Sequence, residues 1–148
     1  MQPLATNKRA YFDYEILETY EAGLELKGFE VKSVKNGRVH LIGSFIVIRN
    51  NEAWLIGTTI TPYQQKNTPA GYDPERTRKL LLHKSEITEL IGKAAEKGLT
   101  LVPLRVYNKG RRIKLEFGVC RHKKKADKRE TIKKREAKRE IDRSLRER

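Results

Sequence analysis

The sequence predicts a mainly β protein with short helices. We expect an OB-like closed antiparallel β-barrel with one main helix, followed by a basic C-terminal tail that is disordered or helical. Several stretches alternate apolar and polar residues, as half-buried strands do, whereas one stretch has clear helical spacing. Turn residues separate the strands at hairpin distances, and closing such a sheet removes its exposed edges. The apolar pattern ends near residue 120, so we expect a barrel over residues 1–120 and a tail over residues 121–148.

The first part of the chain predicts one long strand and one short helix. Residues 1–12 have no regular pattern and should be irregular. Residues 14–26 alternate with a period of two, which predicts a strand with one buried face, bent near Gly23. Residues 28–37 carry two valines three positions apart and end in Asn-Gly, which favours one or two helical turns.

The middle of the chain predicts a hairpin. Residues 45–49 and 53–60 are rich in β-formers, and the Asn-Asn-Glu segment at 50–52 is a suitable connection. Gly43 and Gly57 mark bulges or sharp bends, which a small barrel requires.

A long polar loop follows over residues 61–78. Connections of this length are uncommon inside compact domains and are usually functional or disordered. Its two tyrosines, Tyr63 and Tyr72, either stack on nucleic-acid bases or pin the loop to the barrel.

The last part of the barrel contains the main helix and a second hairpin. Residues 80–82 are a short apolar strand. Residues 83–97 have apolar side chains at helical spacing, and Gly98 is a plausible stop. Residues 100–107 and 111–120 should pair as a hairpin.

The tail carries most of the excess charge. Residues 121–148 hold fourteen Lys or Arg and six Asp or Glu, a formal +8 of the +14 of the whole chain. A segment with so few apolar residues cannot offset its ordering entropy by burial, so we expect an arm that is mobile when free. Good helix formers and a weak apolar row at Ala137, Ile141 and Leu145 predict that it becomes helical on a polyanion. The alternative is a solvated tail with no defined task.

Composition narrows the class of partner. A charge of +14 and a pI near 10 point to nucleic acid or an anionic membrane. No apolar run approaches the roughly 20 residues that span a bilayer, and no signal-peptide pattern begins the chain. The single Cys120 excludes an internal disulfide and fits a reducing compartment. We expect a cytoplasmic protein without a membrane partner. RNA is the favoured ligand, and DNA is the second candidate.

The residues give no sign of catalysis. The histidines His40, His83 and His122 are scattered, and none has metal-ligand spacing with another His or Cys. We expect no enzyme, no metal and no cofactor. Glu21 and Glu30 are more informative, because a carboxylate near RNA repels phosphate. Such a carboxylate is useful there only if it accepts a hydrogen bond from a base or a ribose hydroxyl, or orients a nearby Arg. The alternative is that both are ordinary solvated carboxylates.

Several motifs, in order along the chain, resemble the SsrA-binding protein family, also called small protein B. They are Asn7-Lys8-Arg9-Ala10, Tyr20-Glu21-Ala22-Gly23, Gly28-Phe29-Glu30-Val31-Lys32-Ser33, Asp73-Pro74-Glu75-Arg76-Thr77-Arg78-Lys79-Leu80-Leu81-Leu82, Gly98-Leu99-Thr100-Leu101-Val102-Pro103-Leu104 and Asp127-Lys128-Arg129. The resemblance implies an adaptor that binds the tRNA-like domain of transfer-messenger RNA (tmRNA) and delivers it to stalled ribosomes, the process of trans-translation. It implies that the body stands in for the missing anticodon arm and that the tail folds as a helix in the empty message channel near the decoding centre. Elongation factor Tu and alanyl-tRNA synthetase would be indirect partners, and we expect a monomer.

The resemblance also implies two sets of binding residues. The RNA-binding set is Asn7, Lys8, Arg9, Glu21, Gly23, Glu30, Lys32, Arg78, Lys79 and Leu81. The ribosome-binding tail set is Lys123, Lys124, Asp127, Lys128, Arg129, Lys133, Lys134 and Arg135. Within the second set, the family motif at 127–129 is needed for peptide tagging rather than for RNA binding.

The tail departs from the family pattern at two positions. His122 stands where the family has a hinge Gly, and Ala126 stands where it has a ring that could stack on a decoding-centre base. That contact is therefore absent here or moved, for example to His122. The competing function is a structural ribosomal protein or a general RNA chaperone with a basic extension, and a nuclease is a distant third.

Overall fold

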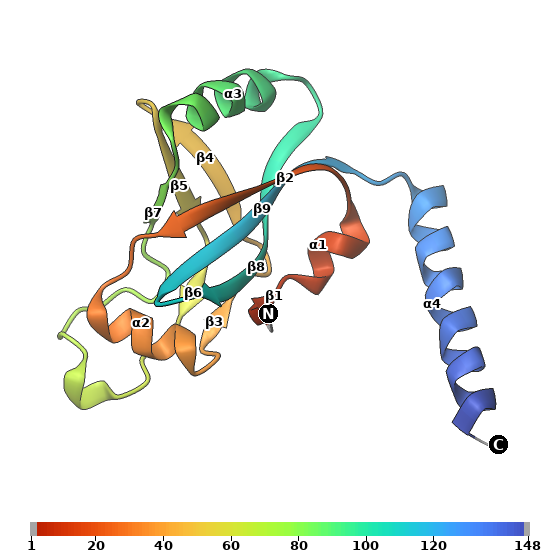
Figure 1. The fold of residues 1–148 in the computed structure, drawn as a ribbon, viewed down its shortest axis with the longest axis horizontal. Helices are drawn as coiled ribbons and strands as arrows, with labels where there is room; N and C mark the ends of the chain where they lie inside the picture. The colour runs from red at the N-terminus through yellow and green to blue at the C-terminus, as the bar shows by residue number, and fades with distance from the viewer. Residues whose placement is uncertain (1–2, 147–148) are drawn as a thin grey trace.

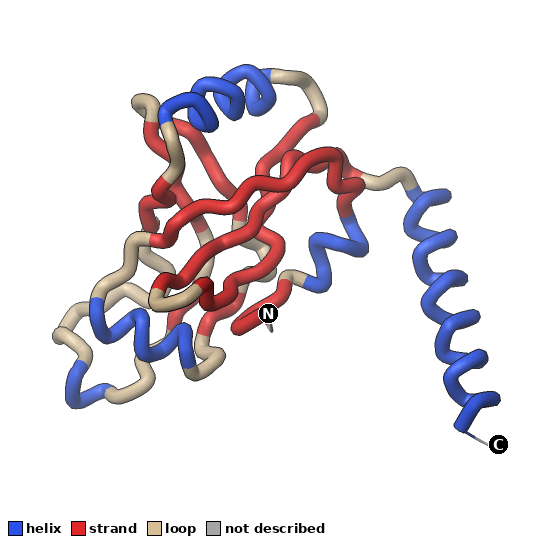
Figure 2. Tube along the Cα trace, in the orientation of Figure 1, coloured by secondary structure: helices blue, strands red, loops and turns tan. Residues whose placement is uncertain are grey.

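The structure is a computed structural model that describes residues 3–146. It is mainly β, with three short helices on the body and a long helix that extends away from it (Figures 1 and 2). The strands are β1 (Pro3–Thr6), β2 (Tyr14–Leu24), β3 (Val39–His40), β4 (Phe45–Arg49), β5 (Glu52–Ile56), β6 (Thr59–Ile60), β7 (Arg78–Leu81), β8 (Leu99–Lys109) and β9 (Arg112–His122). The helices are α1 (Lys8–Asp13), α2 (Gly28–Lys35), α3 (Lys84–Ala95) and α4 (Lys125–Arg146), with a 3-10 turn at Gln65–Asn67.

Seven strands form one antiparallel sheet in the order β1-β8-β4-β5-β7-β2-β9. Strand β8 also pairs with β9, so the pairings run from β8 through β4, β5, β7, β2 and β9 and return to β8. Strands β3 and β6 form a separate two-stranded sheet. The expected mainly β architecture is confirmed.

The core lies on the inner side of the curved sheet. Leu55, Leu80, Leu115 and Phe117 are at most 1% exposed, and α3 adds the fully buried Leu90. These residues alternate with outward-facing ones along their strands, as the period of two predicts. The alternation in the sequence therefore identified the long strands β2 and β9 together with their buried sides.

Residues 3–6 and 8–13 form a strand and a helix, so the prediction of an irregular segment over residues 1–12 was wrong for residues 3–12; residues 1–2 lie outside the described residues. Strand β1 pairs with β8, and Asn7 caps α1 by accepting a hydrogen bond from the amide of Ala10 at 3.2 Å. A strand of only four residues is too short to show a clear alternation in the sequence. Its order comes from its pairing with β8. The expected short helix near residues 28–37 is α2, the expected main helix is α3, and α1 was not expected.

The turn chemistry of the hairpins is as expected. Asn50 and Asn51 have φ angles of 51° and 60°, which suit the tight turn between β4 and β5. The expected return strand over 53–60 is interrupted at Gly57, whose φ is 86°. A Cβ there would lie 3.3 Å from the carbonyl oxygen of Gly43, so the two glycines allow a sharp bend.

Strand β9 continues two residues beyond its expected end at 120, because Arg121 and His122 pair with Glu15 and Tyr14 of β2. Helix α4 begins at Lys125, so the connection between sheet and helix is very short. The structure shows residues 125–146 of the tail as a helix. That it becomes ordered only on a polyanion stays a prediction.

Candidate nucleic-acid interface

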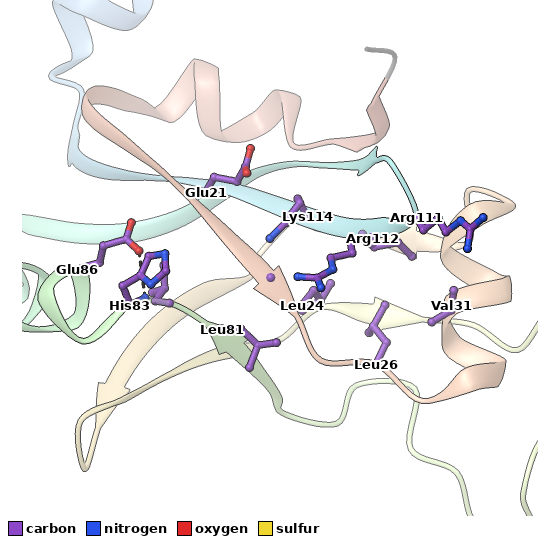
Figure 3. A pocket seen from close by; sticks show the side chains of 13 residues that line it. Glu21, Leu24, Leu26, Val31, Leu81, His83, Glu86, Arg111, Arg112 and Lys114 are labelled. Atoms are coloured by element: carbon purple, nitrogen blue, oxygen red, sulfur yellow. Dashed lines mark hydrogen bonds between the residues drawn. The ribbon is translucent and has the colours of Figure 1, made fainter.

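A hollow of about 920 Å³ lies where β2, β7, the start of α3 and the β8–β9 turn meet (Figure 3). Strand register places Leu81 of β7, Gly23 of β2 and Lys114 of β9 in one row across this surface. Leu26 and Leu81 lie on one side of the hollow, and Arg112 and Lys114 lie on the other. The hollow thus combines an apolar surface with a cationic edge, which suits both parts of a nucleotide.

Glu21 lies at the edge of this hollow and is held in place. The hydroxyl of Tyr107 donates to one carboxylate oxygen, and Nζ of Lys109 donates to the other at 3.0 Å. These hydrogen bonds lower the pKa of Glu21, and burial together with the Glu21 carboxylate raises the pKa of Tyr107. Glu21 is therefore an ionised, oriented acceptor whose side chain is still 37% exposed. It is not a freely solvated carboxylate.

Gly23 and Leu81 form a close pair. A Cβ on Gly23 would lie 3.1 Å from the Cβ of Leu81, nearer than such atoms normally approach. Leu81 is 52% exposed, so a large apolar side chain rests on the glycine and faces solvent. Because Gly23 has no side chain, Leu81 can pack directly against the backbone of β2.

The cationic edge was missed by sequence reasoning. Arg111 and Arg112 are exposed at the β8–β9 turn, and Lys114 is partly exposed on the next outward position of β9. Their alternation with buried residues was visible in the sequence. Only the pairing of Lys114 with Gly23 shows that they share a surface with the predicted residues.

Glu30 and Arg78, two residues of the predicted RNA-binding set, are buried, and their role in RNA binding stays a prediction. Both side chains are fully inaccessible, and Arg78 donates to Glu30 Oε2 from Nε at 2.9 Å and from Nη2 at 2.7 Å. Arg76 and the Tyr72 hydroxyl also donate to Glu30. Burial alone would raise the pKa of Glu30, but hydrogen bonds from Arg76, the Lys27 amide, Arg78 and Tyr72 lower it to about 2. These charges leave no surface for RNA and instead fix the long loop to α2.

Tyr72 therefore pins the loop, one of the two alternatives for the loop tyrosines. Its hydroxyl oxygen also lies 3.0 Å from the Ile60 carbonyl oxygen, and its ring packs edge-on against Phe29. Tyr63 differs, because it is 38% exposed and lies between Lys32 and Arg38, each 5.4 Å from its ring centre. Lys32, another predicted residue, thus belongs to this second surface, while its neighbour Val31 lines the hollow.

Asn7 is also buried, at 3% exposure. Its side chain donates to the Pro103 carbonyl oxygen at 2.9 Å and caps α1, so its role in the fold is structural. Its neighbours Lys8 and Arg9 are exposed on α1. Of the predicted RNA-binding set, the hollow brings together Glu21, Gly23 and Leu81, and Lys79 lies beside them on the same strand as Leu81.

Part of the predicted tail set contacts α1. Lys128 lies 3.3 Å from a carboxylate oxygen of Asp13. Lys128 and Arg135 also lie over the ring of Phe12, at 5.9 and 5.6 Å from its centre. Lys123 donates from its side chain to the Tyr11 carbonyl oxygen at 3.1 Å. The other predicted tail residues are exposed: Lys124, Asp127, Arg129, Lys133 and Lys134.

His122 is the last residue of β9, so it is not a hinge in this fold. Its ring packs against Tyr14, with ring centres 4.3 Å apart and planes inclined by 39°. Ala126 lies in the first turn of α4 and is exposed. Whether His122 replaces the missing stacking contact stays a prediction.

Other chemistry has little support in residues 3–146. They contain no group of three or more His, Cys, Asp or Glu arranged to hold a metal ion. None of their helices is long and apolar enough to span a membrane. Cys120 is buried, and burial raises its pKa to about 11, so it is a packing residue and a poor nucleophile at neutral pH.

Known proteins similar to the chain agree with these features. A family model described as SmpB protein matches residues 4–147. The SsrA-binding protein of Carboxydothermus hydrogenoformans is 54% identical over 145 residues, covering 98% of this chain and 97% of that protein. The SsrA-binding protein of Thermosynechococcus vestitus is 52% identical, covering 98% and 95%.

A solved structure is also similar to this chain. A chain from the work "tmRNA-SmpB: a journey to the center of the bacterial ribosome" superposes with a TM-score of 0.69 and 50% sequence identity. The match covers 84% of this chain and 87% of that chain. Family model, sequence relatives and solved structure thus agree over nearly the whole length, and the chain belongs to the SmpB protein family.

Proposed function

We propose that the protein is an RNA-binding adaptor that binds the tRNA-like domain of tmRNA and delivers it to stalled ribosomes for trans-translation. The observation that carries this proposal is the hollow at Glu21, Gly23 and Leu81, which lies within a full-length family match. Glu21 supplies a fixed acceptor for base or ribose donors, Leu81 an apolar contact, and the nearby Arg and Lys side chains bind phosphate.

The proposal divides the chain into two parts. Residues 1–120 are the RNA-binding body, and the ring of strand pairings supports a closed OB-like barrel there. Residues 121–148 are the ribosome-binding tail, which enters the empty message channel near the decoding centre as a helix. Its cations Lys124, Arg129, Lys133 and Lys134 are exposed and free to face rRNA phosphates.

The burial of some predicted residues supports two different roles within the proposed RNA-binding set. Glu21, Gly23, Lys79 and Leu81 contact RNA at the hollow, while Lys8, Arg9 and Lys32 are exposed cations on other surfaces. Asn7, Glu30 and Arg78 act indirectly, by fixing α1, α2 and the long loop. The protein acts without catalysis or cofactor, as a cytoplasmic monomer. Elongation factor Tu and alanyl-tRNA synthetase meet it only through the RNA.

A competition titration tests the function. Labelled tRNA-like domain is bound to the full-length protein at near-physiological salt, with an elongator tRNA and a random RNA of equal length as competitors. We expect a preference of ten-fold or more for the tRNA-like domain, which is about 1.4 kcal/mol of specificity. Equal binding to all three would favour the structural ribosomal protein or the general RNA chaperone instead.

A further inference from the structure

The outer face of strands β4, β5 and β7 carries an apolar patch that the proposed function does not use. Direct pairing places Val47, Trp54 and Lys79 in one row across the three strands, and Phe45 pairs with Ile56 in the next row. Directly paired residues point to the same side of a sheet. The alternate residues, including Leu55, are the buried core, so this row faces outward.

The patch is accessible. Phe45 is 44% exposed, and Val47, Trp54 and Ile56 are partly exposed. Side chains of the hairpin and the end of the long loop, including Trp54 and Thr77, line a shallow hollow of about 330 Å³. An exposed tryptophan beside aliphatic neighbours is a surface on which a flat ring can stack.

This patch is continuous with the proposed RNA site. Lys79 and Leu81 are two residues apart on β7 and therefore lie on the same side of the sheet. Leu81 pairs with Gly23, and Lys79 pairs with Trp54. One uninterrupted outer surface therefore runs from Gly23 through Leu81 and Lys79 to Trp54.

The charges around the patch suit RNA. Arg49 is exposed at the end of β4, and Lys79 presents a partly exposed ammonium group 3.2 Å from Glu52. Cations beside an exposed aromatic ring bind the phosphate of a nucleotide whose base stacks on that ring. Arg49 is the better placed of the two for phosphate, because the ammonium group of Lys79 also pairs with the Glu52 carboxylate.

We propose that Trp54 is a stacking platform for an unpaired base of the tRNA-like domain, flanked by Val47 and Ile56 and next to Lys79. This rests on the proposed function, because the same RNA would occupy the hollow at Glu21 and Leu81. Trp54 thereby extends the recognised surface from β7 to the adjacent strand β5.

Intrinsic fluorescence tests the proposal, because Trp54 is the single tryptophan of the chain. The full-length protein is titrated with the tRNA-like domain, and RNA binding is measured in parallel by gel mobility. We expect tryptophan quenching whose midpoint coincides with that of binding. Trp54→Ala should weaken binding by about five-fold or more, Trp54→Phe should retain most of it, and Leu17→Ala, an exposed apolar residue at the other end of β2, should change nothing.

The outcomes separate the two proposals. Binding by gel mobility without quenching, and with full affinity in Trp54→Ala, would overturn the stacking platform and leave the adaptor function intact. Absence of any preference for the tRNA-like domain would overturn the function itself. If small ribosomal subunits protect Trp54 from acrylamide whereas the RNA does not, the patch faces a ribosomal partner and the proposal is wrong. Wild-type quenching and Trp54→Phe decide the matter even if Trp54→Ala does not fold.

Discussion

Two neighbouring side chains hold the Glu21 carboxylate in place. Tyr107 and Lys109 both donate to its carboxylate, which keeps it ionised and fixes its direction. A carboxylate repels phosphate, so a purely electrostatic view expects its removal to strengthen RNA binding. The oriented acceptor predicts the reverse.

We expect Glu21→Gln to weaken binding of the tRNA-like domain by about ten-fold, because a hydrogen bond to a charged group contributes about 1.5–3 kcal/mol. Fluorescence anisotropy of labelled RNA measures this effect. Glu15→Gln, an exposed position on the same strand, makes the same charge change and is the control. Tighter binding by Glu21→Gln would show that the residue only repels RNA.

Glu30 makes acid stability predictable. Its folded-state pKa of about 2 lies below the ordinary value of 4.5, so its contribution is complete above pH 4.5 and is lost as the pH falls toward 2. We expect Glu30→Gln to be less stable than wild type by about 3–5 kcal/mol at pH 7, because Arg76 and Arg78 lose their buried partner. The two proteins should converge near pH 2.

Urea unfolding at a series of pH values measures this difference, and Glu25→Gln serves as an exposed control of equal charge. A difference that does not change between pH 7 and pH 2 would mean that the carboxylate charge contributes little. Because Glu30 is fully buried, we expect the Glu30→Gln variant to bind RNA less well only under conditions in which part of it is unfolded.

At the scale of elements, β2 connects the core to the proposed RNA surface through Gly23. We expect Gly23→Ala to leave the sheet intact but to push Leu81 outward, since its Cβ would be only 3.1 Å from that of Leu81. RNA binding should weaken by about three- to ten-fold, on the scale of a partly lost stacking contact. Gly28→Ala is the matched control, because a Cβ there meets nothing within 4 Å. Equal affinity of both variants for the RNA would contradict the proposed role of Leu81.

Elements with their own periodicity were predictable, and those that depend on a distant partner were not. The alternation of residues 14–26 gave β2, and the helical spacing of 83–97 gave α3. Strand β1 exists through its pairing with β8, which no local pattern reveals. For the same reason, motif residues such as Glu30 were identified but their burial was not. A charged residue in a charged segment is predicted to be exposed. Only the fold shows that Glu30 is buried together with its partner Arg78.

At the scale of the whole molecule, the two proposed parts should separate in function. We expect a protein that ends after Lys124 to bind the tRNA-like domain nearly as well as the full chain and to lose peptide tagging on stalled ribosomes. A cut after Cys120 would be a poorer test, since it removes Arg121 and His122, which pair with β2. In vitro tagging with purified ribosomes and tmRNA measures the effect, and undiminished tagging would refute the division of labour.

The contact between α1 and α4 has a mechanical consequence. A helix of 22 residues is about 33 Å long, and this one is joined to the sheet by only two residues. Asp13 contacts it at Lys128, and Phe12 contacts it at Lys128 and at Arg135, about halfway along the helix. About 16 Å of α4 lies beyond Arg135, so a rotation of about 30° about that contact moves its far end by roughly 8 Å. The contacts between α1 and α4 thus influence where the far end of α4 points.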